Sequence, residues 1–98
     1  MAVNKIEVSL KEVLRQAIID LEYVEDYALD QIVIEIPKDK AHGDYSSNIA
    51  MQLTKVLRRN PREIASQIID AIDNDAGNID HVEIAGPGFI NLFLKSWT

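Results

Sequence analysis

The most constraining feature of this sequence is a Gly-Pro-Gly step at residues 86–88, set between two segments with the pattern of β-strands. The segment 79–85 precedes it, and the segment 89–94 that follows alternates regularly. Glycine and proline in this order are typical of a tight turn. The pattern predicts an antiparallel hairpin, which requires an antiparallel or mixed sheet to pair with.

The strand predicted over 89–94 has two chemically different faces. Its even-numbered residues are Ile, Leu and Leu, an ordinary core face. Its odd-numbered residues, Phe89, Asn91 and Phe93, place an amide between two aromatic rings. Such a face can stack on an unpaired nucleotide base and hydrogen-bond its edge. The alternative is a strand buried on both faces, with Asn91 satisfied by backbone groups.

Upstream of the hairpin, a helix and a strand are predicted first. Ser9 begins a capping box, and apolar residues recur at helical spacing over 10–22. A β-branched, alternating run at 32–36 is ended by Pro37 and predicts a strand.

Two further helices are predicted between this strand and the hairpin. One of Asp44, Ser46 and Ser47 is expected to cap a helix whose apolar positions run from 49 to 57. Asn60, followed by proline, marks the start of the third helix.

The order of elements predicts an α+β fold. We expect residues 1–98 to form a single domain, with an antiparallel or mixed sheet of three to four strands packed against about three helices.

The charge distribution is acidic with a basic centre. The net charge of −6 argues against a general nucleic-acid binder. Residues 36–62, however, hold six Lys or Arg and two Asp or Glu, a net +4. Arg58, Arg59 and Arg62 gather where the second predicted helix ends and the third begins, and are candidates for phosphate contacts. The alternative is a solvated helix end whose cations complement the helix dipole.

No catalytic or metal site assembles from the sequence. His42-Gly43-Asp44 invites a catalytic interpretation, with His42 and Asp44 as the base and carboxylate of a small hydrolase, but the spacing fits no nucleophilic triad. A structural corner, with Gly43 at positive φ and Asp44 as a helix cap, is favoured. The two histidines and the scattered carboxylates have no metal-ligand spacing.

The composition argues against disulfide-bonded, thiol-dependent, membrane-spanning and secreted proteins. Without cysteine there is no disulfide framework or thiol nucleophile. No apolar run is long enough to span a bilayer, and the first residues lack a signal-peptide pattern, so a cytoplasmic protein with no membrane partner is expected. An indole at Trp97, next to the end, suggests a chain cut from a longer one, with Trp97 packing on the missing part.

Three segments in this order and spacing resemble the N-terminal domains of arginyl-tRNA synthetases. They are Ile34-Glu35-Ile36-Pro37, the run from His42-Gly43-Asp44 to Ala50, and Ala85-Gly86-Pro87-Gly88-Phe89-Ile90-Asn91. The resemblance implies an α+β domain that precedes a class I catalytic core and contacts the corner and D-loop of tRNA. The family's base-contacting residues fall on Phe89 and Asn91, where some members carry tyrosine in place of phenylalanine.

The resemblance also implies what this sequence lacks. A parent enzyme would ligate arginine to its tRNA using ATP with Mg, but the class I signatures that bind ATP are absent here, so no catalytic residue and no cofactor is expected in these 98 residues. A second hypothesis is a structural module, in which the Phe89 and Phe93 face and Trp97 pack on the catalytic core without reading tRNA.

Overall fold

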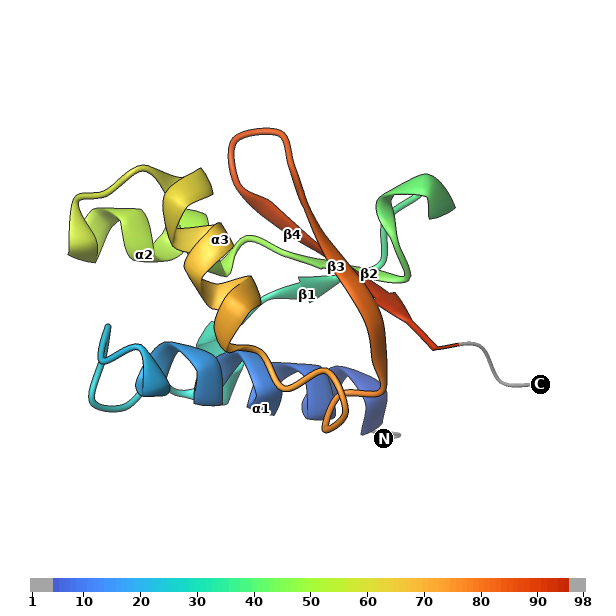
Figure 1. The fold of residues 1–98 in the computed structure, drawn as a ribbon, viewed down its shortest axis with the longest axis horizontal. Coiled ribbons are helices and arrows are strands. Elements are labelled where there is room, and N and C mark those ends of the chain that lie inside the picture. Colours follow the sequence, from blue (N-terminus) through green and yellow to red (C-terminus); the bar gives the residue numbers. More distant parts are fainter. Residues whose placement is uncertain (1–4, 96–98) are drawn as a thin grey trace.

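The structure is a computed structural model that describes residues 5–95. Three helices and four strands are present in this range: α1 (Lys5–Asp20), β1 (Ile34–Glu35), β2 (Tyr45–Ser47), α2 (Ile49–Leu57), α3 (Pro61–Ala71), β3 (Ile79–Ala85) and β4 (Phe89–Leu94). Short 3₁₀ turns, Leu29–Gln31 and Lys40–His42, precede β1 and β2. Figure 1 shows their arrangement.

The strands form one antiparallel sheet in the order β1-β2-β4-β3. β3 and β4 make the hairpin, and β2 pairs with β4 from a distant part of the sequence. The predicted α+β class is therefore confirmed, with an antiparallel sheet of four strands and three helices.

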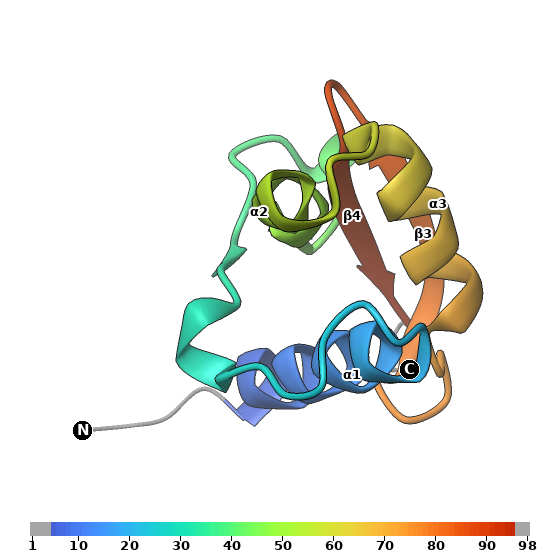
Figure 2. The ribbon, with the colours of Figure 1, turned by 90° about the vertical axis from the view of Figure 1, so that its left-hand side faces the viewer.

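All three helices cover one face of the sheet. α2 contacts β4, α3 contacts β3 and β4, and α1 contacts α3 and β1; Figure 2 views the molecule from the side of α2 and α3. The core lies between the two layers and is formed by buried apolar side chains, among them Leu14, Leu53, Ile68, Ile90 and Leu92. Their burial supplies most of the stabilising free energy.

Local predictions were partly wrong. Ser9 is not a cap, because α1 begins before it and contains it. The predicted strand at 32–36 is reduced to Ile34–Glu35. Asn60, by contrast, caps α3 as predicted, accepting a hydrogen bond from the Arg62 amide at 2.8 Å.

The segment that was expected only to cap α2 forms β2 instead. Asp44 lies before this strand and does not cap the helix. Ser47 does accept a hydrogen bond from the Ile49 amide at 3.2 Å, so it satisfies one amide of the first turn from within the strand.

The acidic connector after α1 is tied back by one ion pair. The Arg15 guanidinium donates to the Asp26 carboxylate and to the Tyr27 carbonyl. This hydrogen bond from Arg15 holds the pKa of the Asp26 carboxyl below its ordinary value.

Among residues 5–95, no helix is long and apolar enough to cross a membrane. Trp97 lies outside the described residues.

Candidate nucleic-acid interface

The sheet face opposite the helices carries a row of polar side chains. The register places Glu35 beside Ser46, Ser46 beside Asn91, and Asn91 beside Glu83. Residues directly opposite each other in an antiparallel sheet point to the same side. The three helices pack on the other side, so this outer face is open to a ligand.

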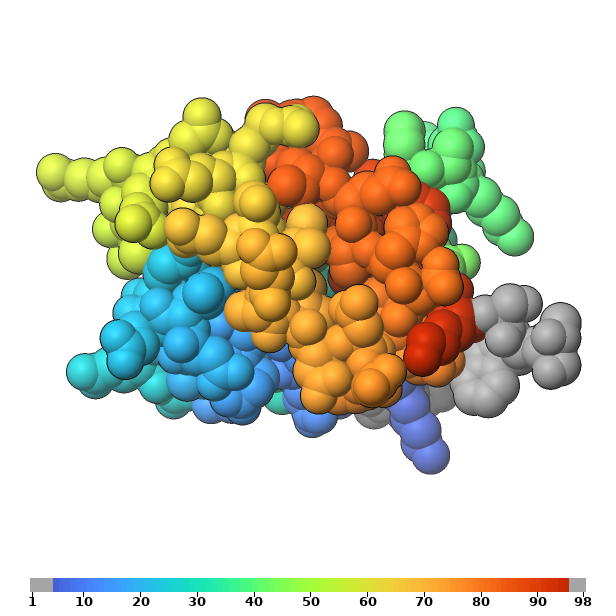
Figure 3. All heavy atoms as spheres, in the orientation of Figure 1, coloured from blue at the N-terminus to red at the C-terminus, as the bar shows by residue number. Residues whose placement is uncertain are grey.

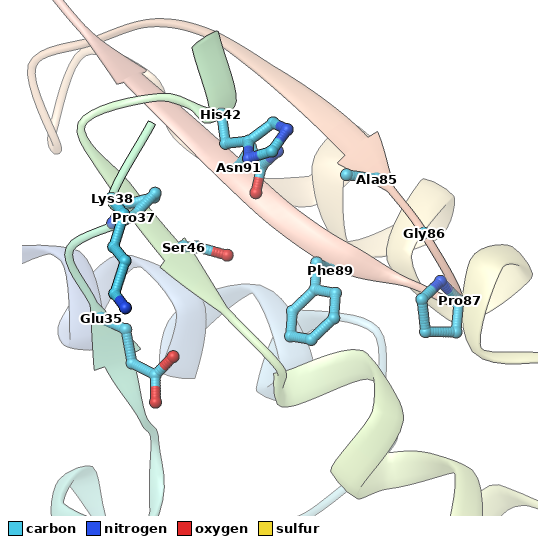
Figure 4. A pocket seen from close by; sticks show the side chains of 10 residues that line it. All are labelled: Glu35, Pro37, Lys38, His42, Ser46, Ala85, Gly86, Pro87, Phe89 and Asn91. Atoms are coloured by element: carbon cyan, nitrogen blue, oxygen red, sulfur yellow. The ribbon is translucent and has the colours of Figure 1, made fainter. Parts of the chain in front are cut away.

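A pocket of about 400 Å³ opens on the outer face, and Figure 4 shows it from close by. We call it the outer-face pocket. This volume is within the range of roughly 300–1,000 Å³ that is usual for small-molecule sites. Its lining comes from β1, β2, β4, the hairpin turn and the loop before β2: Glu35, Pro37, Lys38, His42, Ser46, Ala85, Gly86, Pro87, Phe89 and Asn91.

Asn91 contributes its amide to the outer-face pocket at a point where β4 is buried on both faces, as the alternative interpretation of this strand expected. The residue is only 4% exposed. Nevertheless, within the described part of the chain the structure gives its side-chain amide no hydrogen bond, so the backbone partners expected for a doubly buried strand are not found. An amide without protein partners can offer both donors and acceptors to a ligand edge.

Phe89 supplies an accessible aromatic ring to the same pocket. It is 36% exposed and stands two residues from Asn91 on the same strand face. Burial therefore separates the two residues that were predicted to bind a base: the ring is open to solvent, and the amide lies deeper. Figure 4 shows both side chains at the pocket, together with Ser46.

The three arginines predicted as phosphate contacts are not gathered at this pocket. Arg59 donates to the Gln67 side chain at 3.2 Å and lines a different hollow, beside Leu21 and Asp70. Arg58 ends α2 with a left-handed φ of 55°. Arg62 does not line the pocket either, but its guanidinium donates to the carbonyl of Gly86, a lining residue in the hairpin turn. Their contact with phosphate stays a prediction.

The residues of the His42-Gly43-Asp44 segment have two different roles: Gly43 and Asp44 hold the loop against β4, and His42 lines the pocket. Gly43 has a φ of 95°, and a Cβ there would lie 2.8 Å from the Leu92 carbonyl oxygen. The Asp44 amide donates to that same oxygen at 2.9 Å, and its carboxylate accepts from the Leu94 amide at 2.9 Å. The structural corner is thus present, but Asp44 clamps β4 rather than capping a helix. His42 is exposed and lines the outer-face pocket.

Sequence reasoning missed three polar residues of the pocket: Glu35, Lys38 and Ser46. Only the alternation of β1 indicated the outward position of Glu35. Ser46 was interpreted as a possible helix cap, because a three-residue strand with two serines carries almost no local strand signal.

Beyond the pocket, the outer face ends in a stacked pair. The rings of His81 and Phe93 are parallel with centroids 4.3 Å apart, and His81 Nδ1 lies 2.6 Å from the Asp80 carboxylate. No group of three or more candidate ligands for a metal ion occurs among residues 5–95.

Comparison with known proteins gives consistent matches. The sequence model described as "Arginyl tRNA synthetase N terminal domain" matches residues 5–94. Arginine–tRNA ligase of Staphylococcus epidermidis is 48% identical over 94 residues, which are 96% of this chain and 17% of that enzyme. Its counterpart in Listeria monocytogenes is 47% identical over 90 residues, 92% of this chain and 16% of the enzyme.

The fold also matches a solved structure. The crystal structure of arginyl-tRNA synthetase from Plasmodium falciparum superposes with a TM-score of 0.76 at 17% identity, over 97% of this chain and 17% of that one. This chain therefore spans 16–17% of the length of the relatives it matches. With a family match over almost all of its described residues, the chain belongs to the arginyl-tRNA synthetase N-terminal domain family.

Proposed function

We propose that this chain is the tRNA-contacting domain of an arginine–tRNA ligase and that the outer-face pocket receives an unstacked base of the tRNA D-loop. Phe89 stacks on the base, and the Asn91 amide hydrogen-bonds its edge. The partners are tRNA and the catalytic domain of the same polypeptide, in the cytoplasm. ATP with Mg and the ligation of arginine belong to that catalytic domain.

One observation carries this proposal: the Asn91 amide is 4% exposed, lacks a protein hydrogen bond within residues 5–95, and lies in a pocket beside an accessible ring. Among residues 5–95, the buried side-chain atoms without a hydrogen-bond partner are Tyr23 Oη and Asn48 Oδ1, so the Asn91 amide is in contact with solvent at the pocket. A ligand edge replaces the hydrogen bonds of this amide to water by direct ones, a net gain of about 0.5–1.5 kcal/mol for each bond. A base is a suitable ligand, because it also has a flat face for Phe89.

Magnitudes limit what the pocket contributes. A stacking contact or a good base-edge contact is worth roughly 1–3 kcal/mol. With a net charge of −6, the domain gains little from long-range attraction to tRNA. The pocket therefore discriminates among tRNAs, while most of the affinity comes from the remainder of the synthetase.

The first prediction concerns Asn91 and Phe89 in the full-length synthetase. Asn91→Ala and Phe89→Leu should each lower kcat/KM for tRNA roughly 5- to 150-fold, as expected for the loss of one contact of about 1–3 kcal/mol. Aminoacylation at varied tRNA concentration measures this. Asn91→Asp keeps the size of the side chain but lacks its donors, and should lose activity similarly.

Matched controls separate recognition from folding. Asn74→Ala alters an exposed asparagine in the turn before β3, and Phe93→Leu makes the same aromatic change on the same strand but outside the pocket. Both should keep kcat/KM for tRNA. If the pocket variants lower the melting temperature while KM for tRNA stays constant, the structural-module hypothesis replaces base reading.

A further inference from the structure

We propose that Lys38 and His42 form a phosphate subsite at the rim of the outer-face pocket. It holds the backbone phosphate that flanks the base contacted by Phe89 and Asn91, and it thus rests on the proposed function. Both residues line the pocket from the loop before β2, residues 38–42. Neither belongs to the arginine group that sequence analysis selected.

The two side chains are exposed and unengaged. Within residues 5–95, neither Lys38 nor His42 takes part in a side-chain hydrogen bond or an ion pair. Asp39, the acid beside Lys38, is already used, because its carboxylate accepts from the Ala41 amide at 2.9 Å and caps the 3₁₀ turn. A lysine ammonium and an imidazole N–H can both donate to a phosphate oxygen.

The backbone around this loop is fixed, although the two side chains are free. Gly43 lies directly against the Leu92 backbone, and Asp44 binds β4 through both its amide and its carboxylate. His42 therefore emerges from a clamped position rather than from a freely moving loop. Figure 3 shows the segment around 38–42, in green, projecting from the body of the molecule beside the hairpin.

The loop faces the pocket from the side opposite to Phe89. Its anchor on β4 is Leu92, three residues beyond Phe89, about 10 Å along a strand, and Asn91 lies between the two. In Figure 4, His42 lies above Phe89 on a different side of the pocket, and Ser46 lies at a height between them. Lys38 lies along a third side, with its ammonium directed toward Glu35.

Charge explains why the subsite takes one phosphate rather than a length of backbone. Glu35 also lines the pocket and repels a second anion, and Glu83 follows in the same row of the sheet. Within this acidic domain, the Lys38 ammonium and an imidazole N–H of His42 thus position one phosphate next to the base.

The test uses the full-length synthetase with Lys38→Gln, His42→Gln and the double variant, and with Lys11→Gln on α1 as the matched control. The double variant should raise KM for tRNA roughly 3- to 10-fold at low salt. It should also make the fall of log kcat/KM with log salt shallower by about 0.7–0.9, the value for one phosphate contact. Lys11→Gln should change neither quantity.

A second arm uses tRNA made abasic at the D-loop position to which the wild-type enzyme is most sensitive. The double variant should keep its full effect on this tRNA, whereas Asn91→Ala should lose its effect. An unchanged salt dependence in the double variant, or an effect that disappears with the base, overturns the phosphate subsite. If Asn91→Ala and Phe89→Leu are also silent on intact tRNA, the proposed function fails as well.

Discussion

At the scale of single residues, Gly43 joins the loop that carries His42 to strand β4, which carries Phe89 and Asn91. It precedes β2, yet it fits against the Leu92 backbone of β4 and sets the position from which His42 reaches the outer-face pocket. Glycine is required there for two reasons: a φ of 95°, and the absence of space for a Cβ. Sequence analysis predicted the positive φ, but it gave no indication of the β4 partner, because that contact joins residues about fifty positions apart.

Gly43→Ala should therefore open the junction between β2 and β4. A Cβ 2.8 Å from a backbone oxygen, combined with a strained φ, is expected to cost about 2 kcal/mol or more. Hydrogen exchange of the full-length enzyme should show faster exchange at the Asp44 and Leu94 amides. Gly86→Ala is the matched control: its φ is 53°, the nearest side-chain atom would be 3.7 Å away, and a cost of only about 1 kcal/mol is expected. Equal exchange in the two variants would contradict this account.

At the scale of elements, the hairpin and α3 position each other. Gly88 packs against Pro61, where an added Cβ would lie 2.9 Å from the proline ring, and Arg62 holds the Gly86 carbonyl. The start of α3 thus fixes the turn that forms one wall of the outer-face pocket. The hairpin and the Asn60-Pro61 start were both predictable, because each depends on residues adjacent in sequence. Their contact was not, because nothing local specifies which elements meet.

β2 shows even more clearly that local sequence does not specify which elements pair with one another. Its three residues, Tyr45–Ser47, form a strand because β1 and β4 supply hydrogen-bonding partners on both sides. No propensity of Tyr-Ser-Ser indicates this pairing. The candidate site was accordingly predictable along β4, where alternation placed Phe89 and Asn91 on one face. It was not predictable across the sheet, where Ser46, Lys38 and His42 complete the pocket.

Arg62 provides a prediction that separates anchoring from phosphate binding. If it only anchors the hairpin, Arg62→Ala should raise KM for tRNA about 2- to 5-fold, the effect of one exposed hydrogen bond, and leave the salt dependence of kcat/KM unchanged. Arg62→Lys should restore part of the loss. Arg59→Ala, in a separate hollow, serves as the comparison. A shallower salt dependence for Arg62→Ala would instead assign Arg62 to a phosphate, as the sequence suggested.

At the scale of the whole molecule, the helices of the described part of the chain cover one face of the sheet and leave the other uncovered. The helices contact β1, β3 and β4 from the core side, and the start of α3 also contacts the hairpin turn. The polar row, the outer-face pocket and the His81–Phe93 stack lie on the opposite side of the sheet. This division lets a small, acidic domain present a local recognition surface without disturbing its core. On the proposed function, the domain influences the synthetase chiefly through tRNA.

Deletion of residues 1–98 from the full-length synthetase should therefore lower kcat/KM for tRNA by at least as much as the stronger single substitution, roughly 100-fold or more. This is the combined effect of a stack, a base-edge contact and a phosphate contact that do not add fully. KM for arginine and for ATP should stay within about twofold at saturating tRNA, since no residue of the domain is assigned to either substrate. The double variant Phe89→Leu, Asn91→Ala should reproduce most of the effect on tRNA. If the deletion raises KM for ATP as much as KM for tRNA while the double variant raises neither, the domain supports the catalytic core instead of reading the D-loop.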